Sequence, residues 1–348
     1  MRFEIDFRQG RLMGHPLLAA VSLTMIAGLM SGTCMLPMKF VRSWRWENLW
    51  LIFSVVSLLI IPWMLAISLV DRLFETYRTL SFRQLVIPML FGAGWGVAQI
   101  LFGISVKRLG LGIAYAIIVG LGAVLGTLVP LFAQQKAIAK QHAIQLIICG
   151  VAVMVIGIAL TTWGGQIKER ASGVSQSASY RSYPGAIFVA VLCGLMAPML
   201  NYSFAFGQDI AQTAVRLGNQ PVHGAYAVWP IGLAGGFLPN VAYSLWLLLK
   251  NRTWPLFRRV TPDFLWSCLM GFLWMGAFAL YGMSASLLGT LGTSVGWGLL
   301  QIFMTMTATL AGAMTGEWQQ ASRSAKLLLG SGMASLTVAI VLLAVGSL

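Results

Sequence analysis

Charged residues are scarce in this sequence of 348 residues. Lys, Arg, Asp and Glu together make up only 9% of it, whereas hydrophobic residues make up 58%. A soluble domain carries about 25% charged residues, so this composition excludes a soluble globular protein. The sequence is that of an integral membrane protein, and the lipid bilayer is its first expected partner.

Residues that carry enzyme chemistry are scarce as well. The chain has 9 Asp and Glu, 3 His and 4 Cys, and no acidic residue stands deep within an apolar segment. The sequence contains no phosphate-binding Gly-rich loop, no metal-ligand spacing and no nucleophile with its base. We therefore expect neither an enzyme nor an ATP-driven pump, and neither a cofactor nor a metal. The cysteines lie in apolar segments, where they are expected to act as small packing residues.

Long apolar runs make up most of the chain. A membrane-spanning helix needs roughly 20 apolar residues, and ten segments have this length: 16–38, 48–70, 84–105, 110–132, 142–163, 184–206, 224–249, 262–284, 290–314 and 324–347. Their lack of polar alternation excludes barrel strands, and helices satisfy their own backbone groups in lipid. The sequence predicts an all-α integral membrane protein with ten transmembrane helices.

One stretch of the sequence occurs twice. Residues 91–121 align without a gap on residues 270–300, so Trp95 pairs with Trp274. A repeat of five helices turns the second half upside down relative to the first, as in many secondary transporters. We predict two inverted five-helix repeats, 1–163 with an N-terminal arm and 184–348, joined by a linker loop at 164–183. Chance similarity between Gly-rich helices is the alternative.

Glycines spaced four residues apart recur in five of the apolar segments. This spacing lets helix backbones approach closely and predicts a tightly packed bundle. The pairs are Gly28/Gly32, Gly92/Gly96, Gly122/Gly126, Gly232/Gly236 and Gly292/Gly296.

Lys and Arg outnumber Asp and Glu by 23 to 9. The basic residues cluster in loops between apolar segments, so the positive-inside rule explains them without a nucleic-acid partner. Loops after odd-numbered segments hold the larger share. We therefore predict a multi-pass protein of the bacterial inner membrane with both termini in the periplasm.

Aromatic and amide residues share helix faces. Trp95 and Gln99 are one turn apart, and so are Trp297 and Gln301. An amide within a bilayer must find a polar partner, and a tryptophan beside an amide suits a polyol, whose carbons stack on the indole while its hydroxyls bond to the amide. Ordinary interhelical packing is the open alternative. The predicted substrate-binding residues are Trp95, Gln99, Tyr115, Asn201, Trp274, Trp297 and Gln301.

Two residues are candidates for coupling transport to protons or for gating it. Lys39 follows Pro37 near a helix end, where it either serves a gate or only extends to the interface. His223 is the histidine nearest a span in the second half, and an unperturbed histidine titrates near about 6.5. The neighbouring Asp209 and Arg216 are expected to be solvated. Sodium held by groups such as Thr293 is the alternative to a proton.

Several motifs resemble the L-rhamnose–proton symporter family of the drug/metabolite transporter superfamily. They are the runs Pro37-Met-Lys39 and Trp44-Arg-Trp46-Glu47, the block FGAGWG from Phe91, the turn from Arg108 to Gly112, and Glu317-Trp318. The resemblance covers nearly the whole chain. It implies ten helices and uptake of a deoxy sugar coupled to the proton gradient.

The chain also departs from that family's pattern. Gly292-Thr293-Ser294 and Leu299-Leu300 stand where acidic and histidine residues are usual, and Gln99 stands in place of asparagine. The first departure removes the family's candidate proton carrier. We expect a secondary transporter of a small sugar, with L-rhamnose and proton symport first, working by alternating access. An exporter of the same superfamily and a non-transporting membrane sensor or scaffold are the alternatives.

Overall fold

The computed structural model describes residues 16–133, 141–171, 183–258 and 262–347. This part of the chain is helical and contains no β-strand. Ten of its helical segments are long and apolar enough to cross a membrane, in agreement with the ten predicted spans. These segments are Leu17–Phe40, Trp46–Leu69, Phe82–Leu109, Ile113–Ala133, Gln141–Lys168, Pro184–Arg216, Pro221–Lys250, Pro262–Leu287, Gly289–Met314 and Arg323–Gly346.

Short breaks divide several spans into separate helices. The first half consists of α1 (Pro16–Thr33), η1 (Leu36–Phe40), α2 (Trp46–Ser54), η2 (Val55–Ile60), α3 (Ile61–Leu69), α4 (Leu73–Thr79), α5 (Phe82–Leu109), α6 (Leu111–Ala133) and α7 (Gln141–Ala171). The second half consists of α8 (Tyr183–Met196), α9 (Met199–Phe206), α10 (Gln208–Arg216), α11 (Pro221–Gly224), η5 (Ala225–Ala227), α12 (Val228–Lys250), η6 (Trp254–Arg258), α13 (Pro262–Leu287), η7 (Gly289–Leu291), α14 (Gly292–Met314) and α15 (Arg323–Gly346).

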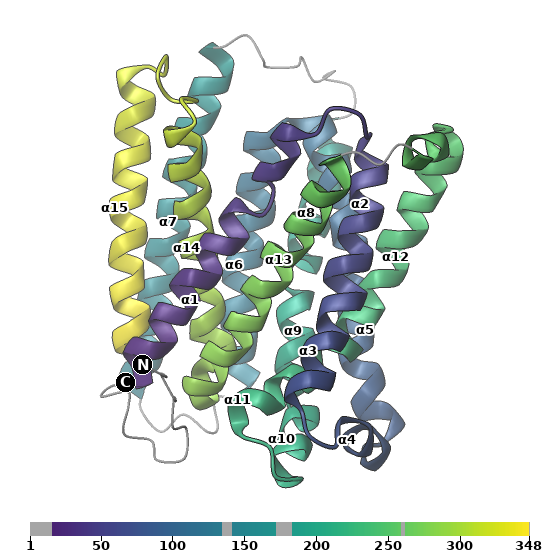
Figure 1. The fold of residues 1–348 in the computed structure, drawn as a ribbon. Helices are drawn as coiled ribbons and strands as arrows, with labels where there is room; N and C mark the ends of the chain where they lie inside the picture. Colours follow the sequence, from purple (N-terminus) through teal and green to yellow (C-terminus); the bar gives the residue numbers. More distant parts are fainter. Residues whose placement is uncertain (1–15, 134–140, 172–182, 259–261, 348) are drawn as a thin grey trace, which may run out of the picture.

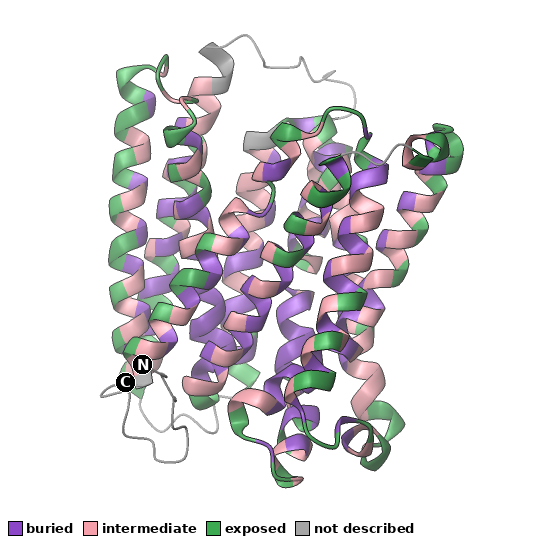
Figure 2. Cartoon of the chain, viewed as in Figure 1, coloured by how far each residue is buried: buried purple, intermediate pink, exposed green. Residues whose placement is uncertain are grey.

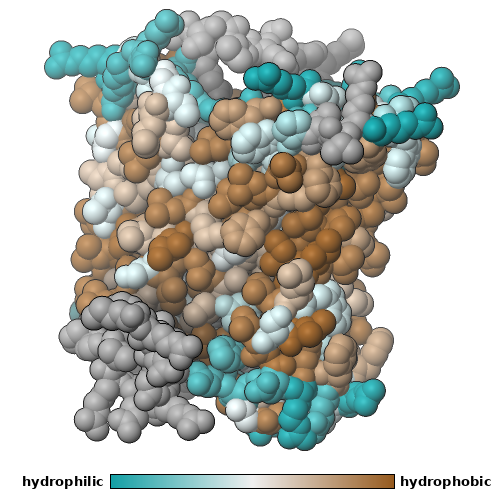
Figure 3. Space-filling model, in the orientation of Figure 1, coloured by the Kyte–Doolittle hydropathy of each residue, from teal (hydrophilic) through white to brown (hydrophobic). Residues whose placement is uncertain are grey.

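The helices stand side by side in one bundle with two distinct ends (Figure 1). The start of α1 and the end of α15 lie at the same end as α4, α10 and α11, which we call the terminal end. The opposite end carries η1, the end of α7 and the start of α15. Hydrophobic residues form the middle of the visible surface, and hydrophilic residues gather at both ends (Figure 3). Exposed residues lie on the outer faces of the helices, and buried ones face inward (Figure 2).

The packing partners of the two halves mirror one another. Helix α1 of the first half packs against α13 and α14, whereas α8 of the second half packs against α5 and α6. Helices α7 and α15, the last spans of the two halves, pack against each other. This exchange of partners is what an inverted repeat requires, although the half-turn superposition of 16–163 on 184–347 stays a prediction.

Glycines allow the closest helix contacts. A Cβ atom built on Gly92 of α5 would overlap the carbonyl oxygen of Gly232 on α12, and one on Gly96 would lie 2.7 Å from the carbonyl oxygen of Gly236. Real Cβ atoms are not found so close to backbone atoms, so only glycine fits at this crossing. Two of the five predicted glycine pairs therefore meet at a single interface, between the third and seventh spans.

The boundary between the halves differs from the prediction at one point. Helix α7 continues to Ala171, so residues 164–171 belong to this helix rather than to a linker loop. Residues 172–182 of the predicted linker lie outside the described residues. So do seven basic residues that the orientation argument counted: Arg2, Arg8, Arg11, Lys136, Lys140, Arg181 and Arg259.

Candidate functional site

The predicted tryptophans meet in the centre of the bundle. Trp95 of α5 and Trp274 of α13 stack with their ring centroids 5.2 Å apart. From Trp274, ring contacts continue through Phe278, at 4.4 Å, to Tyr281, at 6.4 Å, and on to Trp297 of α14, at 6.0 Å. All five rings are buried. The bundle centre is therefore filled by aromatic rings drawn from both halves.

Asn201 joins this aromatic group through hydrogen bonds. Its amide nitrogen donates to the carbonyl oxygens of Gly126 on α6 and Thr293 on α14, both at 2.8 Å, and its carbonyl oxygen accepts from the Tyr281 hydroxyl. The Gly126 carbonyl needs such a donor because Pro130, four residues later, has no N–H to offer it. Asn201 is fully buried and uses all these groups within the protein.

The remaining predicted binding residues lie apart from this group. Gln99 and Gln301 are partly buried one turn after Trp95 and Trp297, and neither lines the cavity described below. Tyr115 lies beside Thr305 of α14. The structure thus brings together Trp95, Asn201, Trp274 and Trp297, directly or through Tyr281, and leaves the other three outside this group.

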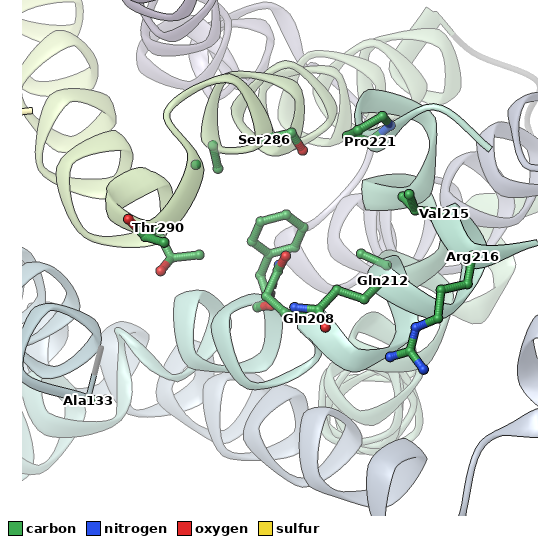
Figure 4. Close-up of a pocket in the computed structure, with 13 residues that line it drawn as sticks. Ala133, Gln208, Gln212, Val215, Arg216, Pro221, Ser286 and Thr290 are labelled. Atoms are coloured by element: carbon green, nitrogen blue, oxygen red, sulfur yellow. Dashed lines mark hydrogen bonds between the residues drawn. The ribbon is translucent and has the colours of Figure 1, made fainter. Parts of the chain in front are cut away.

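A cavity of about 750 Å³ opens at the terminal end of the bundle (Figure 4). It lies between α10 and the turn that joins α13 to α14, and it is bordered by the last residue of α6. The lining residues are Ala133, Phe204, Gln208, Ala211, Gln212, Val215, Arg216, Pro221, Ala285, Ser286, Gly289, Thr290 and Thr293.

The polar groups of the cavity come from two walls. Gln208, Gln212 and Arg216 are spaced four residues apart on α10 and therefore share one helix face. Ser286 and Thr290 lie across from Gln208 and Gln212 (Figure 4). Amides facing hydroxyls give a surface rich in hydrogen-bond donors and acceptors, to which Arg216 adds one positive charge. Of the lining residues, Arg216 was expected from the sequence to be solvated, and Thr293 was the alternative sodium ligand.

The glutamine spacing was the signal that sequence reasoning missed. Residues 208–216 alternate apolar and polar positions with helical period, which marks an amphipathic helix. Asp209 accepts a hydrogen bond of 3.0 Å from Gln84 of α5. The segment after the sixth predicted span is thus an ordered helix, and Asp209 and Arg216 are exposed on it, as predicted.

His223 lies near this cavity but does not line it. It stands half-buried on α11, two residues after Pro221, which does line the cavity. Thr293, the candidate sodium ligand, borders the cavity through the start of α14. Among the described residues, no group of three or more His, Cys, Asp and Glu could hold a metal ion.

Lys39 takes part in a charged cluster at the opposite end. Its ammonium lies 2.6 Å from one carboxylate oxygen of Glu317, and the ammonium of Lys168 lies 3.2 Å from the other. Lys168 also lies over the ring of Trp318, 4.8 Å from its centroid. These contacts join η1 and α7 of the first half to the connection between α14 and α15 of the second. We call Lys39, Lys168 and Glu317 the lysine–glutamate latch.

The charge of Glu317 is stabilised within this latch. Its hydrogen bond to Lys39, followed by the bond and charge of Lys168, holds the pKa of the Glu317 carboxyl below its usual value, although partial burial opposes this. Glu317 therefore stays ionised at neutral pH. A carboxylate that stays ionised can form and break an ion pair at a gate. It is poorly suited to carrying a proton near neutrality.

Two buried carboxylates further bind the opposite end together. Asp263, at the start of α13, accepts hydrogen bonds from the backbone N–H groups of Arg42, Ser43 and Trp44 at 3.2, 2.8 and 2.9 Å. Glu47, at the start of α2, accepts from Asn251 and Thr253 at 3.0 and 2.9 Å. Both sets of bonds cross between the two halves. The opposite end is therefore cross-linked between the halves, whereas the terminal end carries the cavity beside cross-half bonds such as those between Asp71 and Asn219.

A ten-span helical bundle with a polar cavity at one end and a cross-linked opposite end has the architecture of a secondary transporter. The family model described as L-rhamnose-proton symport protein (RhaT) matches residues 17–347, and the chain belongs to this family.

Curated relatives agree with this assignment. The L-rhamnose-proton symporter of Klebsiella pneumoniae subsp. pneumoniae is 28% identical over 90% of this chain and 94% of its own length. The protein of the same name from Cronobacter sakazakii is also 28% identical, over 90% of this chain and 93% of its own. One from Escherichia coli (strain 55989 / EAEC) is 26% identical, over 92% and 96%.

Proposed function

We propose that this protein imports L-rhamnose, or a closely related deoxy sugar, together with protons across the bacterial inner membrane. Membership in the L-rhamnose-proton symport protein family over residues 17–347 is the observation that carries the proposal. The relatives named L-rhamnose-proton symporter match over nearly their whole length, which supports the same substrate here.

The cavity suits a neutral sugar. Its volume of about 750 Å³ falls in the range of roughly 300–1,000 Å³ common for small-molecule sites. The amides of Gln208 and Gln212 and the hydroxyls of Ser286 and Thr290 supply donors and acceptors for sugar hydroxyls. Among the described lining residues there is no Asp or Glu, so the cavity offers no counter-ion for the cationic drugs that an exporter would carry.

The sidedness of the cavity fits uptake. If both termini are periplasmic, as the distribution of basic residues predicts, the cavity opens to the periplasm and the lysine–glutamate latch closes the cytoplasmic end. Alternating access then requires the latch to part while the cavity closes. In this scheme Lys39 serves a gate, since its partner Glu317 keeps it in an ion pair. His223, beside the cavity mouth, is the candidate that exchanges a proton with the periplasm.

Transport by the purified protein in proteoliposomes tests the proposal. An imposed pH gradient, acidic on the side of the terminal end, should drive labelled L-rhamnose to an internal concentration above the external one, and a protonophore should abolish this accumulation. A sodium gradient of equal size at uniform pH is the control. Accumulation with sodium alone would replace the proton by sodium, and failure to exchange L-rhamnose at all would reject the substrate.

A further inference from the structure

One buried donor beside the cavity has no acceptor. Trp229, at the start of α12, is 2% exposed, and no acceptor lies in hydrogen-bonding range of its indole nitrogen within the described residues. Leaving a buried N–H without a partner costs free energy. A hydrogen-bond acceptor on a bound molecule would satisfy this donor.

Neighbouring donors of the aromatic group are satisfied. The Tyr281 hydroxyl donates to Asn201, and the Trp297 indole donates to the Gly122 carbonyl at 3.1 Å. The Tyr202 hydroxyl donates to the Leu125 carbonyl at 2.9 Å. Trp229 therefore differs from these three neighbouring residues, because its N–H has no acceptor within the described residues. Its ring lies 6.5 Å from that of Tyr281, measured between centroids.

A single side chain separates Trp229 from the cavity. Phe204 lines the cavity and stacks on the Trp229 ring, with centroids 4.7 Å apart and planes 12° apart. The indole nitrogen faces Gly282 of α13, because a Cβ built there would lie 3.1 Å from it. Ser286, one turn later on α13, lines the cavity and donates to the Gly282 carbonyl at 3.0 Å. The donor is therefore one helical turn deeper than the cavity wall.

We propose that the cavity continues to Trp229 when sugar is bound, and that its indole N–H donates to a sugar hydroxyl after the Phe204 ring turns aside. This inference rests on the proposed function and names a deeper part of the same site. Glycine at position 282 leaves this side of the indole N–H uncovered, because the Cβ of any other residue there would lie 3.1 Å from the nitrogen. The ligand class is a neutral polyol, whose hydroxyl can accept this bond and whose carbons can lie against the exposed ring.

Equilibrium binding of labelled L-rhamnose to the full-length protein in detergent tests the proposal. Trp229→Phe keeps a ring and removes the N–H, and we expect binding about tenfold weaker, which corresponds to about 1.4 kcal/mol. Trp246→Phe, on the same helix but 50% exposed, is the matched control and should bind as the wild type does.

Gly282→Ala provides a second variant that leaves the indole in place. Its methyl group would lie 3.1 Å from the indole nitrogen and obstruct the approach of an acceptor, so this variant should also bind L-rhamnose severalfold more weakly. Gly103→Ala, at the corresponding position of the first half, is the control, because a Cβ there meets nothing within 4 Å.

The outcomes separate this inference from the proposed function. If the wild type binds L-rhamnose while Trp229→Phe and Gly282→Ala bind it equally well, the inference is wrong and the proposed function stands. If the wild type does not bind L-rhamnose, the proposed substrate fails, and the inference about it fails as well. Should Trp229→Phe not fold, the result for Gly282→Ala decides, and unchanged binding there overturns the proposal.

Discussion

Trp95 and Trp274 stack on each other in the middle of the bundle, 5.2 Å apart and 25° from parallel, and they occupy corresponding positions of the sequence repeat. One comes from the third span and the other from the eighth. A contact between equivalent residues of two halves is expected to lie on or near the axis that relates them. In this structure the two buried rings fill part of the centre of the bundle.

The tryptophan stack should contribute measurably to stability. We expect Trp95→Ala and Trp274→Ala each to lower the free energy of unfolding by about 3–5 kcal/mol, the usual cost of emptying a buried tryptophan site. A double-mutant cycle in detergent should give a coupling of about 0.5–1.5 kcal/mol for the stacked pair. Trp246→Ala, at a half-exposed site, is the control. Strict additivity of the two central variants would mean that the stack stabilises nothing.

Asn201 should be required for stability because Pro130 of α6 cannot donate a backbone hydrogen bond to the Gly126 carbonyl. Asn201→Leu leaves the Gly126 carbonyl without its donor and is expected to cost about 1–3 kcal/mol for each buried group left unpaired. Pro130→Ala restores a backbone N–H four residues after Gly126. The double variant should therefore recover part of the lost thermal stability. If Pro130→Ala rescues nothing, the Gly126 carbonyl is not the group that makes Asn201 necessary.

Removing the charge of Glu317 should loosen the lysine–glutamate latch, whereas changing the pH near neutrality should not. Glu317→Gln removes the carboxylate that both lysines contact, so the opposite end should open more often. Spin labels at the exposed positions Arg45 and Gln320, in a background without native cysteines, would report this as a longer distance population in nanodiscs. Because such half-exposed pairs contribute only about 0–1 kcal/mol, we expect a population shift rather than unfolding. An unchanged distance distribution would show that these contacts do not hold the end closed.

The pH dependence of the latch follows from the lowered pKa of Glu317. The ionised carboxylate is favoured in the closed latch, so the latch's contribution is complete above the ordinary value of 4.5 and is lost as pH falls through the lower, closed-state value. The same spin-label distances should therefore be constant between pH 6 and 8. A transition inside that window would assign proton sensing to the latch.

The amide wall of the cavity should contribute to substrate recognition. Gln212→Ala removes hydrogen-bonding groups from the face of α10 that borders the cavity. We expect kcat/KM for L-rhamnose uptake to fall about three- to tenfold, as one or two lost hydrogen bonds imply. Gln320→Ala, an exposed glutamine at the opposite end, serves as the control. Equal losses in the two variants would remove the cavity from the transport route.

His223 can be tested for coupling separately from binding. His223→Gln should keep exchange of L-rhamnose across proteoliposomes but lose accumulation driven by a pH gradient, because glutamine cannot exchange a proton. Lys39→Gln, measured in parallel, should disturb the latch instead and alter exchange as well. Normal gradient-driven accumulation by His223→Gln would exclude this residue as the proton carrier.

Sequence periodicity predicted the spans and their packing more successfully than the site. Apolar length alone defines ten spans because lipid forces every backbone group into helices. Glycine spacing predicted close helix packing, and Gly92 and Gly232 meet at one such crossing. The central aromatic group was predictable because Trp95 and Trp274 stand in a visible repeat. Asn201 was predicted to meet substrate, but its amide is used by carbonyls of α6 and α14.

The cavity could not be found from the sequence because its walls meet only in three dimensions. Gln212 and Ser286 are distant along the chain, and Gln212 lies in a segment whose polar residues suggested a solvated connection. Glu317 was quoted as part of a motif, yet its partners Lys39 and Lys168 come from two other helices. Such charge pairs depend on the fold, and no local sequence pattern predicts them.

Labelling of the cavity from outside the cell tests the central claim most directly. In a background where Cys34, Cys149, Cys193 and Cys268 are replaced, Ser286→Cys places a single thiol on the cavity wall. A membrane-impermeant maleimide should label this thiol in intact cells, and L-rhamnose should slow the labelling in a saturable manner while a non-transported sugar does not. The absence of labelling from the periplasmic side, or labelling that saturating L-rhamnose leaves unchanged, would contradict a substrate cavity that opens to the periplasm.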